Sequence, residues 1–261
     1  MKRTLFDTLP DKMPTEVQKI VGGCRIYDSS CSPEARVYFV DKGDGYYLKR
    51  AACGTLLREG QMAEYFAKKG LSPRVLGYYT NEYDWLLTER APGEDCTHAD
   101  YLSDPKRLAR LHGERLRALH ELPYDDCPAP SRLSEYLATA DENYRTGNYD
   151  KSQFPDSFGY RSADEAWQVL EDGRHLLKAD TLIHGDYCLP NVMLDGWDKY
   201  TFIDLGNGGV ADRHIDLFWG AWTLWFNLGT NEYRDIFFDA YGRDKIDENV
   251  LRVVAAAEVF G

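Results

Sequence analysis

Two short polar motifs combine residue types that can act on phosphate groups. His184-Gly185-Asp186 is followed after four intervening residues by Asn191, and Asp204-Leu205-Gly206 ends a short apolar run. Phosphoryl transfer from a metal-bound nucleotide requires a carboxylate that meets the acceptor hydroxyl, and further oxygen ligands for the metal. Because Mg²⁺ prefers carboxylate and amide oxygens, the motifs predict that Asp186 orients the acceptor hydroxyl and that Asn191 and Asp204 bind Mg²⁺.

The order and spacing of the two motifs carry more weight than either motif alone. Asp and Asn are common loop residues, and a single His-Gly-Asp occurs by chance. The protein-kinase pattern is H-R-D-x-x-x-x-N followed by D-F-G, and this chain has H-G-D-x-x-x-x-N and then D-L-G. The stretch from Val192 to Asp204 has the length of a β-hairpin, with Asp195-Gly196 as its turn signal.

This stretch resembles the catalytic segment of the aminoglycoside phosphotransferases of the protein-kinase-like superfamily, and it is most similar to their 3'-phosphotransferase branch. The matching segments are His184–Asn191, Phe202–Gly206 and Val210–Arg213. The resemblance implies transfer of the γ-phosphoryl group of ATP or GTP, with Mg²⁺, to the 3'-hydroxyl of an aminoglycoside, and thereby antibiotic resistance. It also implies a two-lobe α/β (α+β) fold, with an N-terminal antiparallel sheet plus helix and a mostly helical C-terminal lobe.

Two alternatives remain open at this point. A related kinase acting on a macrolide, choline, homoserine or an uncharged sugar would use the same catalytic residues. A non-catalytic nucleotide-binding relative could keep the fold without the activity, although the retention of Lys49, Asp186, Asn191 and Asp204 disfavours it.

Composition limits the class of protein. A chain of 261 residues can bury a large core, in one domain or two packed lobes. The net charge of −12 argues against nucleic acid as a partner and suits a polycationic small molecule. We expect no signal peptide, no membrane span and a cytoplasmic protein, as a monomer or a dimer. The six cysteines are dispersed, which favours reduced thiols over zinc ligands or disulfides.

The sequence of the N-terminal part predicts one short helix, a three-stranded meander and a longer helix. The periodicity and turn signals give a helix over 15–21, strands over 24–28, 36–40 and 46–50, a helix over 55–69 and two more strands over 75–80 and 85–90. Ala91-Pro92-Gly93 then breaks the pattern. We therefore expect an N-terminal nucleotide-binding lobe over 1–90, a hinge over 91–97 and a C-terminal catalytic and substrate-binding lobe over 98–261.

Lys49 lies among apolar residues of a predicted strand and therefore needs a partner, because an unpaired buried ammonium group is unfavourable. The resemblance assigns this role to Glu59 on the following helix, with Glu64 as the competing carboxylate. It further implies that Ser32 binds phosphate in a loop without glycine. Tyr47 is expected to stack on the base, and the backbone near Glu89 and Ala91 to contact its edge.

The C-terminal part predicts helices over 104–121, 163–178, 215–228, 232–241 and 247–259, and a strand over 181–184. The stretch 122–162 is the least regular, and it reads equally well as a substrate-recognition insert or as a solvated pair of helices. His112 and His120 are expected to be buried, hydrogen-bonded histidines, and His184 to brace its loop. One of Asp212 and Asp216 is expected to anchor the catalytic loop.

The acceptor site is expected to use Asp150 from the irregular stretch, and Glu258 and Phe260 from the C-terminal tail, as the resemblance implies. The chain departs from the family in the stretch around Asp150, where 148–153 is less densely acidic than usual, and at three further places. Ala257 stands where an Asp is usual, Asn207 stands where an Arg is usual, and the aromatic run 222–226 replaces charged positions. These departures predict an altered or broader range of acceptors.

Overall fold

A computed structural model of the chain describes residues 3–6, 10–31, 33, 35–149 and 159–261. The chain divides into two compact units. The first, which we call the N-terminal unit, comprises Met1–Glu94 and Met193–Gly206, and the second, the C-terminal unit, comprises Asp95–Val192 and Asn207–Gly261. No helix among the described residues combines the length and the apolar character that crossing a bilayer requires.

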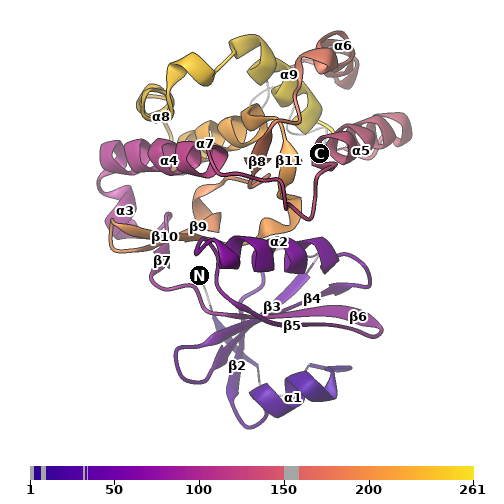
Figure 1. Ribbon diagram of the computed structural model, residues 1–261, viewed down its shortest axis with the longest axis vertical. Helices are drawn as coiled ribbons and strands as arrows, with labels where there is room; N and C mark the ends of the chain where they lie inside the picture. The colour runs from indigo at the N-terminus through magenta and orange to yellow at the C-terminus, as the bar shows by residue number, and fades with distance from the viewer. Residues whose placement is uncertain (1–2, 7–9, 32, 34, 150–158) are drawn as a thin grey trace. The chain divides into compact units, whose positions relative to one another are not determined.

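A six-stranded antiparallel sheet dominates the N-terminal unit (Figure 1). Its strand order is β1-β2-β3-β4-β6-β5. The expected three-stranded meander forms its centre, and Lys49 of β4 lies opposite Val37 of β3 and Leu86 of β6. The strands are β1 (Thr4–Phe6), β2 (Arg25–Asp28), β3 (Ala35–Asp41), β4 (Tyr46–Ala52), β5 (Val75–Thr80) and β6 (Tyr83–Glu89).

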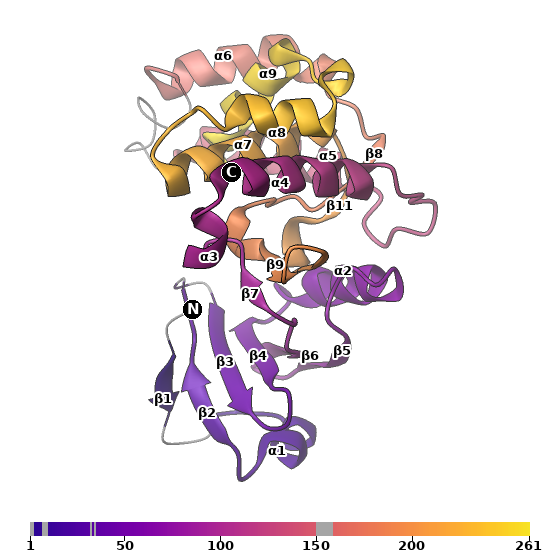
Figure 2. The same ribbon diagram turned by 90° about the vertical axis from the view of Figure 1, so that its left-hand side faces the viewer.

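Helices α1 (Thr15–Val21) and α2 (Leu57–Lys68) cover opposite faces of this sheet, as both views show (Figures 1 and 2). Successive side chains of a strand point to opposite faces. Leu48 is therefore buried on the α1 side, in a cluster with Val17 and Leu87. Its neighbour Lys49 points to the other face, which α2 covers with the carboxylate of Glu59.

A β-hairpin far along the chain belongs to the N-terminal unit. It consists of β9 (Val192–Asp195) and β10 (Lys199–Phe202), which are neighbours in a second sheet. The turn signal Asp195-Gly196 is used, with Gly196 at a φ of +67°. The Phe202 amide donates to the Leu71 carbonyl at 2.7 Å, and the Phe202 ring packs against Phe66 of α2. The hairpin thus brings Asp204 to α2 and β4.

The C-terminal unit is mainly helical (Figure 2). Helix α4 packs on α7 and α8, and α9 packs on α6 and α7. Strands β8 and β11 form a short antiparallel pair. The helices are α3 (Ala99–Leu102), α4 (Pro105–His120), α5 (Arg132–Thr146), α6 (Ala163–Gly173), α7 (Arg213–Leu228), α8 (Arg234–Tyr241) and α9 (Glu248–Glu258). The strands are β8 (Thr181–Ile183) and β11 (Gly209–Ala211), and β7 (Glu94–Asp95) lies where the chain passes from one unit to the other.

Several features of the fold were absent from the sequence-based expectations. Strand β1 extends the sheet by pairing with β2, and β11 pairs with β8. Helix α5 occupies part of the stretch 122–162, for which a pair of helices was one of the two open readings, while 150–158 lies outside the described residues. Helix α6 ends at Gly173 and is followed by a 3₁₀ turn, Arg174–Leu176, so the predicted helix over 163–178 was too long.

Candidate active site

Lys49 is the centre of a group of charged side chains in the N-terminal unit. Its Nζ lies 2.7 Å from Oε2 of Glu59 and 2.8 Å from Oδ1 of Asp204. The expected ion pair with Glu59 is present, and the competing Glu64 is an exposed residue elsewhere on α2. Burial disfavours the charge on Lys49, but the two carboxylates outweigh this effect and raise its pKa, which keeps the ammonium group charged.

Asp204 follows β10 in a backbone conformation that non-glycine residues seldom adopt. Its φ is +60°, in the left-handed region. Asp tolerates this region better than most residues, but the conformation still has an energetic cost, and such residues concentrate at functional sites. The turn directs the carboxylate back to Lys49 on β4, while half of the Asp204 side chain stays exposed to solvent.

Two of the expected nucleotide-binding residues, Tyr47 and Glu89, lie on the neighbouring strands β4 and β6. Tyr47 is two residues before Lys49 on the same face of β4, and its ring packs against Phe39 with a centroid separation of 5.5 Å. The side chain of Glu89 pairs with Arg74 at 2.6 Å, and its amide donates to the Arg74 carbonyl. The side chain of Ala91 is buried. Ser32 lies outside the described residues.

Asp186 and Asn191 meet in a tight loop of the C-terminal unit. The loop runs from β8 to the 3₁₀ turn Leu189–Asn191. The Asn191 side-chain amide donates to Oδ2 of Asp186 at 2.8 Å and to its backbone carbonyl at 3.0 Å. The Cys188 amide donates to the same carbonyl at 2.8 Å. With Nδ2 directed at Asp186, the Oδ1 atom of Asn191 is left as the acceptor of that amide.

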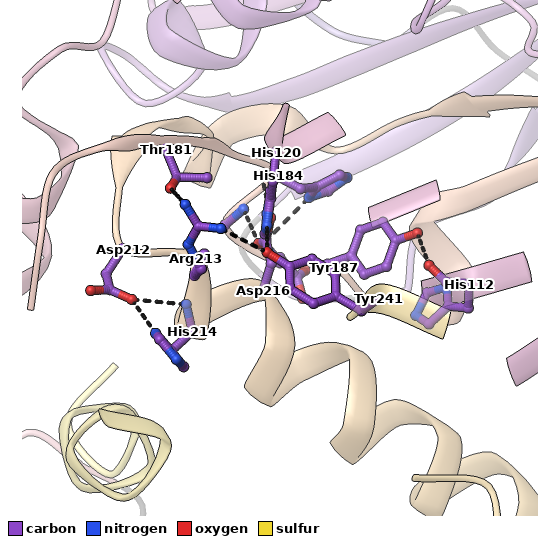
Figure 3. Close-up of polar contacts among 12 residues, drawn as sticks. His112, His120, Thr181, His184, Tyr187, Asp212, Arg213, His214, Asp216 and Tyr241 are labelled. Carbon is purple, nitrogen blue, oxygen red and sulfur yellow. Dashed lines mark hydrogen bonds and ion pairs between the residues drawn. The ribbon is translucent and has the colours of Figure 1, made fainter. Parts of the chain in front are cut away.

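Asp216 on α7 anchors this loop through its backbone (Figure 3). Its Oδ2 accepts from the His184 amide and its Oδ1 from the Gly185 amide, each at 2.7 Å. The expectation that one of the two acidic residues of this segment anchors the loop is confirmed for Asp216. Gly185 has a φ of +84°, and a Cβ there would lie 1.9 Å from the Asn207 carbonyl oxygen, so only glycine fits.

Asp212, the other acidic residue, caps α7. Its Oδ1 accepts from the His214 amide at 2.9 Å and lies 2.7 Å from His214 Nδ1, and its Oδ2 accepts from the Lys178 amide at 2.7 Å. Burial opposes ionisation of this carboxyl, but these hydrogen bonds outweigh burial and lower its pKa. Asp212 therefore fixes the start of the helix that carries Asp216.

The histidines near the loop have supporting roles. His112 stacks on Tyr187 with a centroid separation of 4.2 Å, and burial lowers its pKa to about 3, so it remains uncharged at neutral pH. The Tyr187 hydroxyl donates to the His112 backbone carbonyl at 2.9 Å (Figure 3). His184 Nδ1 lies 3.3 Å from the Asp186 amide, which agrees with the bracing role expected of it.

The expected acceptor-site residues lie at the end of α9. Tyr136 of α5 donates to Oε1 of Glu258 at 2.9 Å. Burial raises the pKa of Glu258 to about 7, and the charge of Asp186 adds to the shift. The Phe260 ring is fully buried and packs against Tyr144 and Trp167, so its contact with an acceptor stays a prediction. Asp150 lies outside the described residues.

Sequence reasoning did not identify the partners that hold these side chains. Tyr136 and Trp219 hydrogen-bond to Glu258, and Arg132 donates to the Asn207 carbonyl at 2.9 Å. Tyr136 belongs to the apolar stripe Leu133, Tyr136 and Ala140. This helical spacing is a signal that could have predicted α5.

The donor types present suit Mg²⁺. Within the described parts of the chain, no three His, Cys, Asp or Glu side chains are grouped so as to hold a metal ion. Mg²⁺ is usually bound by one or two protein oxygens together with substrate phosphates and water. Asp204 offers a half-exposed carboxylate and Asn191 an amide oxygen.

Comparison with known proteins places the chain among phosphotransferases. A family model described as "Phosphotransferase enzyme family" matches residues 33–254. A probable aminoglycoside 3'-phosphotransferase of Lactococcus lactis subsp. lactis (strain IL1403) is 48% identical over 252 residues, which cover 96% of each chain. An aminoglycoside 3'-phosphotransferase of Streptomyces fradiae is 32% identical over 205 residues, covering 74% of this chain and 75% of the relative.

Solved structures agree with this placement. The crystal structure of an aminoglycoside-3'-phosphotransferase of type VIII superposes with a TM-score of 0.77 at 26% identity, covering 94% of this chain and 97% of the other. An aminoglycoside phosphotransferase of Streptomyces rimosus, in complex with ADP and streptomycin, has a TM-score of 0.71 at 23% identity, covering 86% and 90%. The expected kinase-like α/β fold class is confirmed. The chain belongs to the phosphotransferase enzyme family.

Proposed function

We propose that this chain transfers the γ-phosphoryl group of ATP or GTP to the 3'-hydroxyl of an aminoglycoside. The reaction type is inferred from the position of Lys49, whose charged ammonium group lies between the carboxylates of Glu59 and Asp204. The choice of acceptor rests on the relative that is 48% identical over nearly the whole chain and is named a probable aminoglycoside 3'-phosphotransferase. The reaction would confer resistance to such antibiotics in the cytoplasm, where ATP is available.

In this proposal the N-terminal unit holds the nucleotide. Lys49 contacts the α- and β-phosphates, and Glu59 keeps the ammonium group oriented, as in other kinases of this type. Tyr47 stacks on the base, Ser32 contacts phosphate, and the backbone near Glu89 and Ala91 meets the base edge. We assign nucleotide binding to residues 1–90, a hinge to 91–97, and acceptor binding and catalysis to 98–261.

In this proposal the C-terminal unit binds and orients the reacting hydroxyl of the acceptor. Asp186 accepts a hydrogen bond from the acceptor hydroxyl and orients its oxygen for in-line attack. Asn191 holds the Asp186 carboxylate through Nδ2, and its Oδ1 would serve as a metal ligand together with a carboxylate oxygen of Asp204. Bound Mg²⁺ would neutralise charge on the phosphates. Catalysis then consists mainly of positioning and of charge stabilisation.

A pair of acceptors tests this proposal directly. Kanamycin B and tobramycin differ only in the 3'-hydroxyl, which tobramycin lacks. We expect the purified chain, with Mg²⁺ and ATP or GTP, to phosphorylate kanamycin B but not tobramycin. Asp186→Asn should reduce turnover by about a thousandfold or more while nucleotide binding survives, since it removes the group that orients the hydroxyl.

Other outcomes of the same experiment would contradict the proposal. Phosphorylation of tobramycin at a comparable rate would contradict the 3'-regiochemistry. Activity only on a macrolide, choline or homoserine would replace the aminoglycoside by another small-molecule acceptor. Absence of turnover with every acceptor, together with intact nucleotide binding, would indicate a non-catalytic relative.

A further inference from the structure

A buried chain of hydrogen bonds leads from α8 to the loop that carries Asp186 (Figure 3). The Tyr241 hydroxyl lies 2.9 Å from His120 Nδ1, and His120 Nε2 lies 3.0 Å from Asp216 Oδ2. The side chains of His120 and Asp216 have no exposed surface. These residues come from the ends of α4 and α8 and from α7, and they are far apart in sequence.

Asp216 is where this chain of contacts meets the catalytic loop. Its Oδ2 accepts both from the His184 amide and from His120, while Oδ1 accepts from the Gly185 amide. A buried carboxylate is stabilised only when such donors surround it. Loss of the His120 donor would leave Asp216 with the two backbone amides and weaken its hold on their orientation.

The chemistry of the outer residues fixes the direction of every bond. An arginine can only donate, so the 3.4 Å contact makes the Tyr241 oxygen the acceptor from Arg213 Nη1. The Asp216 carboxylate can also only accept, so the ring proton of His120 lies on Nε2, and His120 Nδ1 accepts from the Tyr241 hydroxyl. Arg213 Nη2 also donates to Thr181 Oγ1 at 3.1 Å, on the strand that precedes the loop. One tautomer therefore satisfies the whole series.

We infer that His120 and Tyr241 are positioning residues for phosphoryl transfer. They hold Asp216 in the orientation that fixes the His184–Gly185 backbone, and thereby place Asp186 relative to the acceptor hydroxyl. The inference rests on the proposed function for its catalytic consequence, but the structural part does not depend on activity. Neither residue touches the reacting atoms, so both act through Asp216.

Tyr241→Phe is the sharpest variant, because it removes only the hydroxyl that orients His120. We expect kcat to fall about tenfold or more, since small displacements of a catalytic group reduce the rate strongly. The KM of the nucleotide should change by less than about twofold, because Tyr241 does not touch the proposed nucleotide site. Tyr160→Phe is the matched control: this buried tyrosine of the same unit donates to the Arg252 carbonyl at 2.6 Å. It should lose stability but keep its kcat.

Substitutions of His120 provide a second, independent comparison. His120→Gln keeps a nitrogen donor that can reach Asp216, whereas His120→Leu has a similar volume and no donor. We expect His120→Gln to retain several times more of the wild-type kcat than His120→Leu. If the two variants lose kcat equally, or if Tyr241→Phe behaves like Tyr160→Phe, the positioning role is wrong.

Amide hydrogen exchange separates this inference from the proposed function. Exchange at His184 and Gly185 should be about tenfold faster in Tyr241→Phe than in the wild type, and unchanged in Tyr160→Phe, because only the first variant loosens Asp216. This measurement needs no substrate. A wild-type chain without phosphotransferase activity would overturn the proposed function, while unaltered exchange at His184 and Gly185 in Tyr241→Phe would overturn the positioning role.

Discussion

At the scale of single residues, the charge of Lys49 is maintained by two carboxylates that lie at different points of the sequence. Glu59 is ten residues away on α2, and Asp204 is brought close by the β9–β10 hairpin. The side chain of Lys49 is only 20% exposed, so these ion pairs are screened less than surface pairs. Removal of either carboxylate should therefore affect how Lys49 is presented to phosphate.

Glu59→Gln is expected to reduce kcat/KM for the nucleotide by about tenfold, equivalent to about 1.4 kcal/mol. The amide has the same shape as the carboxylate, but it no longer balances the ammonium charge, and Lys49 shifts toward Asp204. Steady-state kinetics with varied ATP would measure this change. Glu64→Gln on the exposed side of α2 is the control and should match the wild type. An equal loss in both variants would contradict a specific role for Glu59.

The raised pKa of Glu258 predicts that the stability of the chain depends on pH. Burial raises its pKa to about 7 from 4.5, so the folded state holds this proton more tightly than the unfolded chain does. Ionisation of Glu258 therefore lowers the free energy of unfolding. This loss of stability grows as the pH rises from about 4.5 to about 7 and reaches its full size above that range. Glu258→Gln keeps an oxygen that can accept from Tyr136 but removes the charge. The Tm of this variant relative to the wild type should rise between pH 5 and pH 8, as measured by calorimetry.

The same titration should affect an acceptor that carries ammonium groups. Below pH 7 the Glu258 carboxyl is neutral and attracts a cation less strongly, so KM for the acceptor should fall as the pH rises through 7. Comparison with Glu258→Gln removes the contribution of the acceptor's own amines. A variant whose KM follows the wild-type pH profile would show that Glu258 does not contact the acceptor.

At the scale of elements, the predictable part of the fold was the part with local signals. Helix α1 matches its predicted range, 15–21, because Gly22-Gly23 ends the pattern. Strands β3 and β4 lie within one or two residues of their predictions. Strands β1 and β11 have three residues each, too short for a period to be visible, and they exist because β2 and β8 offer them a free edge.

The candidate site was predictable to a similar extent. The apolar strand around Lys49 predicted only that its ammonium group needs a partner, and the resemblance to the aminoglycoside phosphotransferases named Glu59 as that partner. The contact of His120 with Asp216 joins residues 96 positions apart, and no local pattern encodes it. Contacts of this kind arise from the packing of α4 on α7. The helix periodicity predicts which face of each helix is buried, but not which residues of the other helix it contacts.

Helix α7 begins at a buried cap, so its stability should depend strongly on Asp212. Asp212→Ala leaves the His214 and Lys178 amides without their acceptor, which should cost about 1–3 kcal/mol. The Tm should fall by about 2–4 °C for each kcal/mol. Ser162→Ala removes the exposed cap of α6, whose hydroxyl accepts from the Glu165 amide at 3.1 Å, and is the control with a smaller expected loss. Equal shifts in Tm for Asp212→Ala and Ser162→Ala would mean that burial does not increase the stabilisation that a helix cap provides.

At the scale of the whole molecule, nucleotide binding and folding are linked. A ligand that binds only the folded chain stabilises it by about 2.7 kcal/mol when present at a hundred times its Kd. Lys49 is the proposed contact of the nucleotide phosphates, and Asp204 and Asn191 are the proposed ligands of the metal. The stabilisation should therefore depend on Mg²⁺ as well as on ATP.

Thermal denaturation with ATP, with and without Mg²⁺, tests this linkage. For the wild type we expect saturating ATP with Mg²⁺ to raise Tm by about 5–10 °C, given about 2–4 °C for each kcal/mol, and ATP with EDTA to give a much smaller rise. Asp204→Asn should lose most of the increment due to Mg²⁺, because an amide replaces the anionic ligand. Asp186→Asn is the control and should keep it, since Asp186 is assigned to the acceptor hydroxyl and not to the metal. If Asp204→Asn retains the full increment while Asp186→Asn loses it, the roles of the two carboxylates must be exchanged.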